Sequence, residues 1–157
     1  MNTWARGFLY DNLTDYFKAV GLLTSALQSA RQYQQLSVNR NDQESLAISY
    51  GKLGGLYQAL GDLKQARTFF EKHLQLNEQL AEANPESVGL LNGLAISYYK
   101  LGMIQVEMEQ LEEARKLLKQ AEQIWITLAE AIPDVPEYSR NLGIVRQELT
   151  QLSGDES

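Results

Sequence analysis

The chain has 157 residues, of which 44% are hydrophobic and 22% charged, a composition typical of folded globular proteins and too apolar for disorder. Its 20 acidic and 14 basic residues leave a formal net charge of −6, which argues against nucleic acid as a partner, because such proteins neutralise phosphates with lysine and arginine. Cysteine is absent, so disulfides, thiolate catalysis and cysteine-based zinc sites are excluded.

Residues 1–41 are predicted to form a first pair of helices. Leu9 and Tyr10 recur 47 residues later as Leu56 and Tyr57, so this stretch carries the pattern of the clearer segment that follows it. No part of the chain shows the alternation of apolar and polar residues that predicts a strand.

Residues 42–86 show the helical pattern most clearly, because their apolar residues form two stripes at helical spacing. Gly61 and Asp62 separate the stripes, with glycine ending one helix and aspartate capping the next. The first stripe consists of Leu46, Ile48, Tyr50, Leu53, Leu56, Tyr57 and Leu60, and the second of Leu63, Ala66, Phe69, Phe70, Leu74, Leu76 and Leu80.

The following segment repeats this one. The string LAISYGKLG at residues 46–54 returns as LAISYYKLG at residues 94–102, an offset of 48, and the string LAEA at 80–83 returns at 128–131. We therefore expect a third hairpin at 87–134, a truncated or capping helix at 135–152 and a disordered tail at 153–157. The chain is predicted to be a single all-α repeat domain, residues 1–157, with about seven helices.

Two prolines mark the junctions between the predicted hairpins. Pro85 and Pro133 lie 48 residues apart, each near the end of a second stripe. Because proline excludes the preceding residue from helix and suits a first turn, each is predicted to end one helix and open the next.

The spacing of particular residues within a hairpin resembles a known repeat. Gly54, Tyr57 and Ala66 stand at the intervals of the tetratricopeptide repeat, together with Tyr50, Leu53, Gly61 and Phe70. The third hairpin departs from this pattern at Gln105, where the pattern has tyrosine, and at Glu109, where it has glycine; the first places Arg6 at the leucine position.

This resemblance implies an α-solenoid of antiparallel helical hairpins wound into a right-handed superhelix, whose concave groove is lined by the first helix of each pair. The period of 48 exceeds the usual 34 by about four helical turns, and such lengthened repeats resemble those of large bacterial signalling and scaffold proteins. The usual role of the family is to hold a peptide or protein segment.

The resemblance also nominates groove residues by their place after the aromatic position. Gly51, Gly55 and Ala59 would form an open centre, and an apolar strip of Tyr99, Met103 and Val106 would face it. The strip has an alternative interpretation, in which it packs against a neighbouring repeat or a second protomer. The full set of predicted partner-binding residues is Trp4, Phe8, Asn12, Lys52, Gly55, Gln58, Tyr99, Lys100, Met103 and Val106.

No catalytic, metal or cofactor constellation is visible. His73 is the only histidine and is interpreted as a structural residue between helices, because a metal site or triad needs partners at suitable spacing. No glycine-rich phosphate loop is present, and the longest apolar stretches fall far short of the roughly 18 residues that span a membrane. We expect a cytoplasmic protein that is not an enzyme and associates with neither membrane nor cofactor.

Three functions compete at this stage. The favoured one is a protein–protein interaction module that binds a peptide or helix of a partner protein in the groove. The second is a structural or self-associating scaffold segment of a larger repeat protein, which could form a homodimer. The third and least favoured is a regulatory domain that senses a peptide, since it needs more repeats to wrap its ligand.

Overall fold

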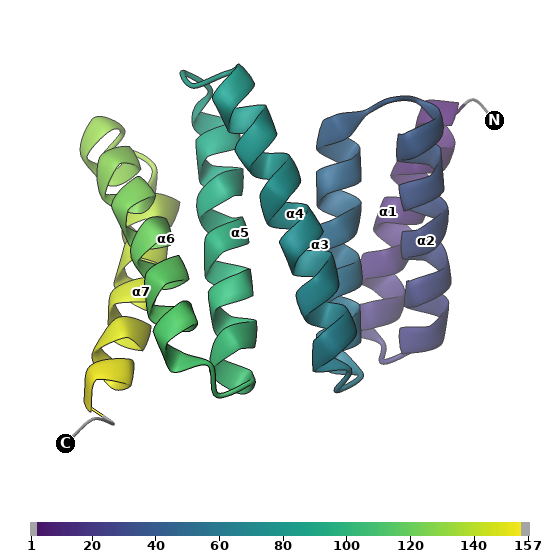
Figure 1. The fold of residues 1–157 in the computed structure, drawn as a ribbon. Coiled ribbons are helices and arrows are strands. Elements are labelled where there is room, and N and C mark those ends of the chain that lie inside the picture. Colours follow the sequence, from purple (N-terminus) through teal and green to yellow (C-terminus); the bar gives the residue numbers. More distant parts are fainter. Residues whose placement is uncertain (1–2, 155–157) are drawn as a thin grey trace. The chain divides into compact units, whose positions relative to one another are not determined.

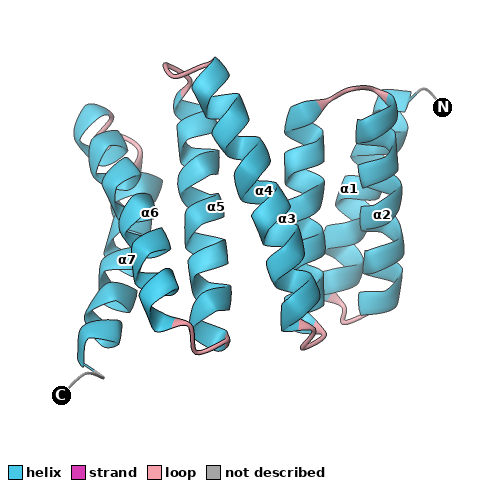
Figure 2. Cartoon of the chain, viewed as in Figure 1, coloured by secondary structure: helices cyan, strands magenta, loops and turns pink. Residues whose placement is uncertain are grey.

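The computed structural model describes residues 3–154, and side chains from residue 5 onward. Within this range all regular structure is helical, and consecutive helices run antiparallel with short turns between them (Figures 1 and 2). The all-α fold and the hairpin packing of a helical solenoid are therefore confirmed. The helices are α1 (Thr3–Ala19), α2 (Leu23–Asn39), α3 (Gln43–Ala59), α4 (Leu63–Ala83), α5 (Val88–Glu107), α6 (Leu111–Ala131) and α7 (Pro136–Gly154).

Some helix ends follow the local signals predicted from the sequence, and others do not. Gly61 has a φ of +77°, and the carboxylate of Asp62 accepts a hydrogen bond from the Gln65 amide at 3.1 Å, so the predicted break and cap are confirmed. Pro85 instead lies in the turn before α5, whose N-cap is Ser87. The predicted first-turn role of proline was wrong for Pro85 and also for Pro133, which lies in the turn before α7; Pro136 takes that role at α7.

The chain divides into two compact units, Met1–Leu76 (unit 1) and Asn77–Ser157 (unit 2). Helices α1 to α3 and the first part of α4 build unit 1, whereas the last part of α4 builds unit 2 with α5 to α7. The single domain over residues 1–157 and the right-handed superhelix stay predictions. Helix α7 extends to Gly154, so the predicted tail begins two residues too early; residues 155–157 lie outside the described range.

Unit 1 is held together by small residues on one helix and bulky ones on the next. Ala26 and Ala30 of α2 are fully buried against Leu53 and Leu56 of α3. Gly54 of α3 also faces α4: a Cβ built on it would lie 2.7 Å from Cδ1 of Phe70, so any side chain there would have to displace the ring.

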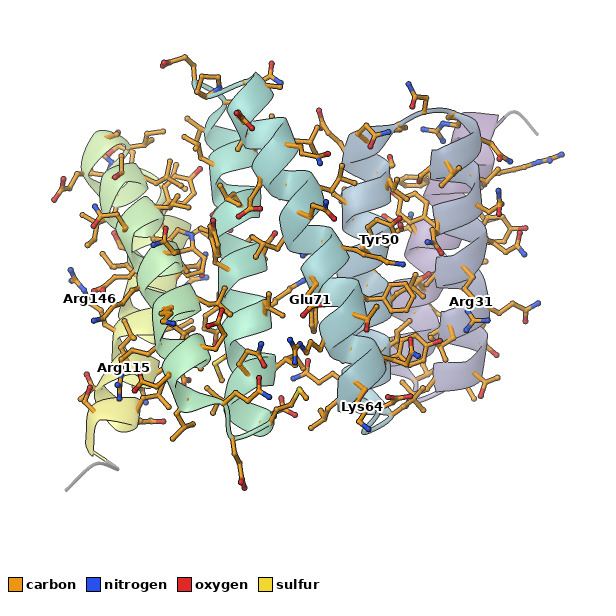
Figure 3. All side chains as sticks on the ribbon, in the orientation of Figure 1. Arg31, Tyr50, Lys64, Glu71, Arg115 and Arg146 are labelled. Atoms are coloured by element: carbon orange, nitrogen blue, oxygen red, sulfur yellow. The ribbon has the colours of Figure 1, made fainter. Side chains whose placement is uncertain are left out.

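Unit 2 repeats this arrangement 48 residues later. A Cβ on Gly102 of α5 would lie 3.0 Å from Leu118 of α6, the same close approach with a different side chain. Trp125 of α6 is buried in the core cluster, and its indole nitrogen donates a hydrogen bond to Oδ1 of Asn92 at 2.9 Å. Two arginines labelled in Figure 3, Arg115 of α6 and Arg146 of α7, also donate hydrogen bonds between these two helices.

The two departures of the third hairpin from the repeat pattern are both visible in unit 2. Gln105 stands where the second hairpin has Tyr57; it is buried, and its Oε1 has no hydrogen-bond partner in the described structure. Glu109 adopts a φ of +59° in the turn between α5 and α6, the conformation that Gly61 adopts in the corresponding turn of unit 1. The chain therefore keeps the backbone of the repeat where it has lost the preferred side chains.

Candidate functional site

In unit 1, the face shared by α1 and α3 brings several predicted residues together. The ammonium group of Lys52 on α3 lies 3.0 Å from Oδ1 of Asp11 and 2.7 Å from Oδ2 of Asp15, both on α1. Lys52 is mostly buried, whereas Asp15 is largely exposed. This three-residue ionic clamp fixes α1 against α3 and neutralises one of the two predicted groove lysines.

The clamp also sets the charge state of its lysine. Burial on its own lowers the pKa of Lys52, because it removes water from the ammonium group. The hydrogen bonds and negative charges of Asp15 and Asp11 outweigh burial and raise the pKa above its ordinary value. Lys52 therefore stays charged at neutral pH and is available to a ligand only through exchange with these carboxylates.

Phe8 and Asn12 lie one turn apart on α1, and both are exposed. Phe8 is 74% exposed, the largest value among the exposed large hydrophobic side chains of the described chain. The amide of Asn12 donates to the Phe8 carbonyl at 2.7 Å and so contacts its own helix. An exposed aromatic ring beside an ionic cluster is a surface on which a protein ligand can bury apolar area.

The glycines predicted to form an open centre differ in their surroundings. A Cβ on Gly55 would meet only the ammonium group of Lys18, 3.4 Å away, so the backbone is accessible there. Gly51 is buried, and a Cβ on it would lie 3.2 Å from the imidazole of His73 on α4. The prediction that Gly51 is part of an open surface was wrong, because this glycine makes room for His73.

The apolar strip of α5 lies within unit 2. Tyr99, Met103 and Val106 are half-buried and pack against the core cluster formed with α6 and α7. The rings of Tyr99 and Trp125 are 6.0 Å apart between centroids. These contacts favour the alternative interpretation of the strip as packing, with one edge left exposed.

The environment of Tyr99 reflects the same packing. Burial raises the pKa of its hydroxyl, and the negative charge of Glu148 on α7 raises it further. The remaining predicted residues Gln58 and Lys100 are half-buried on α3 and α5, and the side chain of Trp4 lies outside the described residues.

Two residues of the unit 1 face were missed from the sequence. Asp15 and Lys18 lie one and two turns beyond Asp11, at a spacing that places all three on one side of α1. That spacing was the available signal. The repeat pattern did not indicate Asp15 and Lys18, because it assigns groove positions by their distance from the aromatic residue and carries no information about charges near the end of the helix.

The expectations for His73, metal ions and membranes can be compared with the described residues. His73 is buried between α3 and α4, as expected of a structural histidine. Between residues 3 and 154, no three histidine, cysteine, aspartate or glutamate side chains gather in a way that could hold a metal ion. No described helix is long and apolar enough to cross a membrane.

Comparison with known families agrees with this architecture. The model of the tetratricopeptide repeat matches residues 45–127, more than half of the chain. The chain therefore belongs to the tetratricopeptide repeat family, which supports a role in protein interaction or scaffolding. No curated protein matches the chain.

The solved structures to which this chain is similar are distant in sequence. BtubC (BKLC) from P. vanneervenii is 12% identical, with a TM-score of 0.66 over 99% of this chain and 66% of that one. This chain thus spans slightly less than two thirds of BtubC. MamA from Desulfovibrio magneticus RS-1, in a structure covering residue 41 to the end, is 19% identical, with a TM-score of 0.37 over 97% of both chains.

Proposed function

We propose that the chain is a protein-interaction module that holds a segment of a partner protein on the α1/α3 face of unit 1. The observation that carries the proposal is the accessible backbone of α3 at Gly55, with the exposed ring of Phe8 on the neighbouring helix α1. A partner side chain can approach Gly55 closely while an apolar neighbour covers Phe8.

The charges on this face indicate what kind of segment fits. Lys18 and Lys52 are balanced by Asp11 and Asp15, so the cluster has no net charge and attracts neither strongly acidic nor strongly basic peptides. We therefore expect a segment that buries apolar side chains on Phe8 and exchanges hydrogen bonds with the clamp. Binding to such a mixed surface should depend only weakly on salt.

The test uses Gly55→Phe, which fills the face with a ring. The fold should tolerate it, because the added Cβ meets only the flexible end of Lys18. The matched control is Leu60→Phe, at an exposed residue beyond the end of α3. Each protein is immobilised, retained host proteins are identified by mass spectrometry, and the retained partner is then purified and titrated calorimetrically.

We expect a partner that wild type and Leu60→Phe both bind, and whose affinity falls at least tenfold with Gly55→Phe. A partner that binds all three proteins equally would place the binding surface elsewhere. If wild type retains no protein above an empty matrix, the interaction role of this face is rejected.

The scaffold role is a second candidate, supported by one observation. Tyr99, Met103 and Val106, the strip nominated for binding in unit 2, pack against their own core cluster. A surface used in this way stabilises the hairpin stack and leaves less area for a ligand. A scaffold role predicts that partner capture is insensitive to both Gly55→Phe and Met103→Leu.

A further inference from the structure

The outward face of α1 carries a stripe of exposed residues that is symmetric along the helix. Its members are Ala5, Phe8, Asn12, Tyr16 and Ala19, all exposed. The steps between them are three, four, four and three residues, so the spacing is the same from either end. At 100° per residue these positions span less than a quarter of the helix circumference.

The residue types follow the same symmetry about Asn12. Aromatic rings stand four residues to either side, at Phe8 and Tyr16, and alanines stand seven residues to either side, at Ala5 and Ala19. A second copy of α1, laid antiparallel with a two-fold axis through Asn12, therefore places each aromatic ring opposite an aromatic ring and each alanine opposite an alanine. Such self-complementarity is what a two-fold interface requires, because both partners use the same patch.

We propose that the chain forms a homodimer in which the α1 stripe of one copy packs antiparallel on the α1 stripe of a second copy. Phe8 and Tyr16 pair across the interface twice, and the two Asn12 amides meet on the axis. A polar residue at the centre of an apolar seam fixes register and orientation in helix pairs. This inference does not rest on the proposed function, but both use the ring of Phe8, so a second copy and a partner segment would compete for that ring.

The charges on α1 are compatible with this pairing. The stripe contains no charged residue, and the two carboxylates of α1, Asp11 and Asp15, are drawn towards Lys52 on the side that faces α3. No like charges are therefore brought together along the seam. The choice of a second copy over an unrelated helix follows from the palindromic order of residue types about Asn12, since steps of three and four residues recur on any helix face.

The exposed area suits a reversible dimer. Phe8 is 74% and Tyr16 60% exposed, so each ring has on the order of 100–150 Å² left to bury. With the flanking Leu9 and Val20, which are also exposed, two copies would bury about 800–1,000 Å² in total. This lies just below the range of stable interfaces, and we expect a dissociation constant of about 10 μM or weaker.

Sedimentation velocity of the full chain at about 5–500 μM tests the proposal. We expect the weight-average mass to rise from 17.7 kDa towards twice that value. Tyr16→Glu should keep the protein monomeric throughout, whereas the control Leu60→Glu, at an exposed apolar residue off the stripe, should dimerise like wild type. Circular dichroism establishes that each variant is folded.

A charge exchange on the axis provides a second variant that does not depend on Tyr16. In a dimer of either Asn12→Lys or Asn12→Glu, two like charges would meet on the axis, so each variant should be monomeric alone. An equimolar mixture of the two variants pairs opposite charges there and should restore dimers. The control pair, Thr68→Lys and Thr68→Glu on the exposed side of α4, should change nothing. Asn12 is suited to this exchange because its side-chain amide donates to the Phe8 carbonyl of its own helix.

Three results would overturn the proposal. The first is a wild-type protein that stays monomeric at the highest concentration. The second is equal weakening by Tyr16→Glu and Leu60→Glu, and the third is a mixture of folded Asn12 variants that does not dimerise. Loss of partner binding in Gly55→Phe with an intact dimer would separate this interface from the α1/α3 face.

Discussion

The backbone of Gly54 lies directly against the ring of Phe70, so that a Cβ at Gly54 would come within 2.7 Å of the ring carbon Cδ1. Forty-eight residues later, Gly102 and Leu118 make the corresponding approach at 3.0 Å. The second and third hairpins thus each bring their two helices together at one glycine of the first helix. The contact explains why a residue with poor helix propensity stands in the middle of α3 and of α5.

The neighbouring glycines of α3 allow a direct test of this close approach. Gly54→Ala should destabilise the protein by about 1–3 kcal/mol, because the ring of Phe70 must shift. Gly55→Ala should instead stabilise it by about 0.5–1 kcal/mol, because alanine restricts the unfolded chain at a position with room for a Cβ. Urea unfolding followed by circular dichroism measures both, and equal effects would contradict the packing described for α3 and α4.

The turn between α5 and α6 offers a stabilising substitution. Glu109 has a φ of +59°, in the left-handed region where a side chain costs about 1–2 kcal/mol and glycine costs nothing. Glu109→Gly should therefore raise the urea midpoint of unfolding. Glu107→Gly, within the last turn of α5, is the matched control and should lower it.

The stability of Met103 variants can decide whether the α5 strip of Tyr99, Met103 and Val106 is core packing or open surface. Met103 is half-buried against the core cluster of unit 2, so Met103→Asp should cost about 2–3 kcal/mol by placing a carboxylate against apolar neighbours. Met103→Leu conserves the volume and should cost less than about 1.5 kcal/mol. An unchanged urea midpoint for Met103→Asp would show that the strip is open surface and would restore it as a candidate binding site.

The hydrogen bond between Tyr98 and Glu78 makes stability sensitive to alkaline pH. The hydroxyl of Tyr98 donates to Oε1 of Glu78 at 2.7 Å, and burial together with this carboxylate raises the pKa of Tyr98 to about 12. The unfolded chain loses this proton near its ordinary pKa of 10.0, so the stabilisation is complete below pH 10 and is lost as pH rises through 12.

Tyr98→Phe removes both the hydrogen bond and its pH dependence. Its free energy of unfolding should lie below that of wild type at pH 8, by about 0.5–1.5 kcal/mol, and the two should converge as pH approaches 12. Urea unfolding at pH 8, 10 and 11 measures the difference. A difference that does not change with pH would contradict the assigned role of Glu78.

Local signals in the sequence were sufficient for the helices and for part of their boundaries. The 3.6-residue periodicity and the break at Gly61 each depend on residues close together in the chain, the repeat offset requires only comparison of the sequence with itself, and each agrees with the structure. The tetratricopeptide pattern also marked Gln105 and Glu109 as departures. Pro85 was misassigned, because the capping hydroxyl of Ser87 decides where α5 begins.

The candidate site was predicted less well, because side chains near the groove are shared between helices that are distant in sequence. The pattern assigned Gly51 and Gly55 to the same face, yet only the fold places His73 against Gly51 and leaves Gly55 open. It nominated Lys52 for a partner without revealing that α1 supplies two carboxylates to it.

The amino-acid sequence by itself therefore determined the helical repeat, its register and the apolar side of each helix, since these follow from periodicity and from the conformations open to glycine and proline. Tertiary structure alone decided which apolar or charged residues remain available to a partner. Periodicity shows that Met103 and Lys52 lie on a given side of their helices, but availability depends on what the neighbouring helix places opposite them.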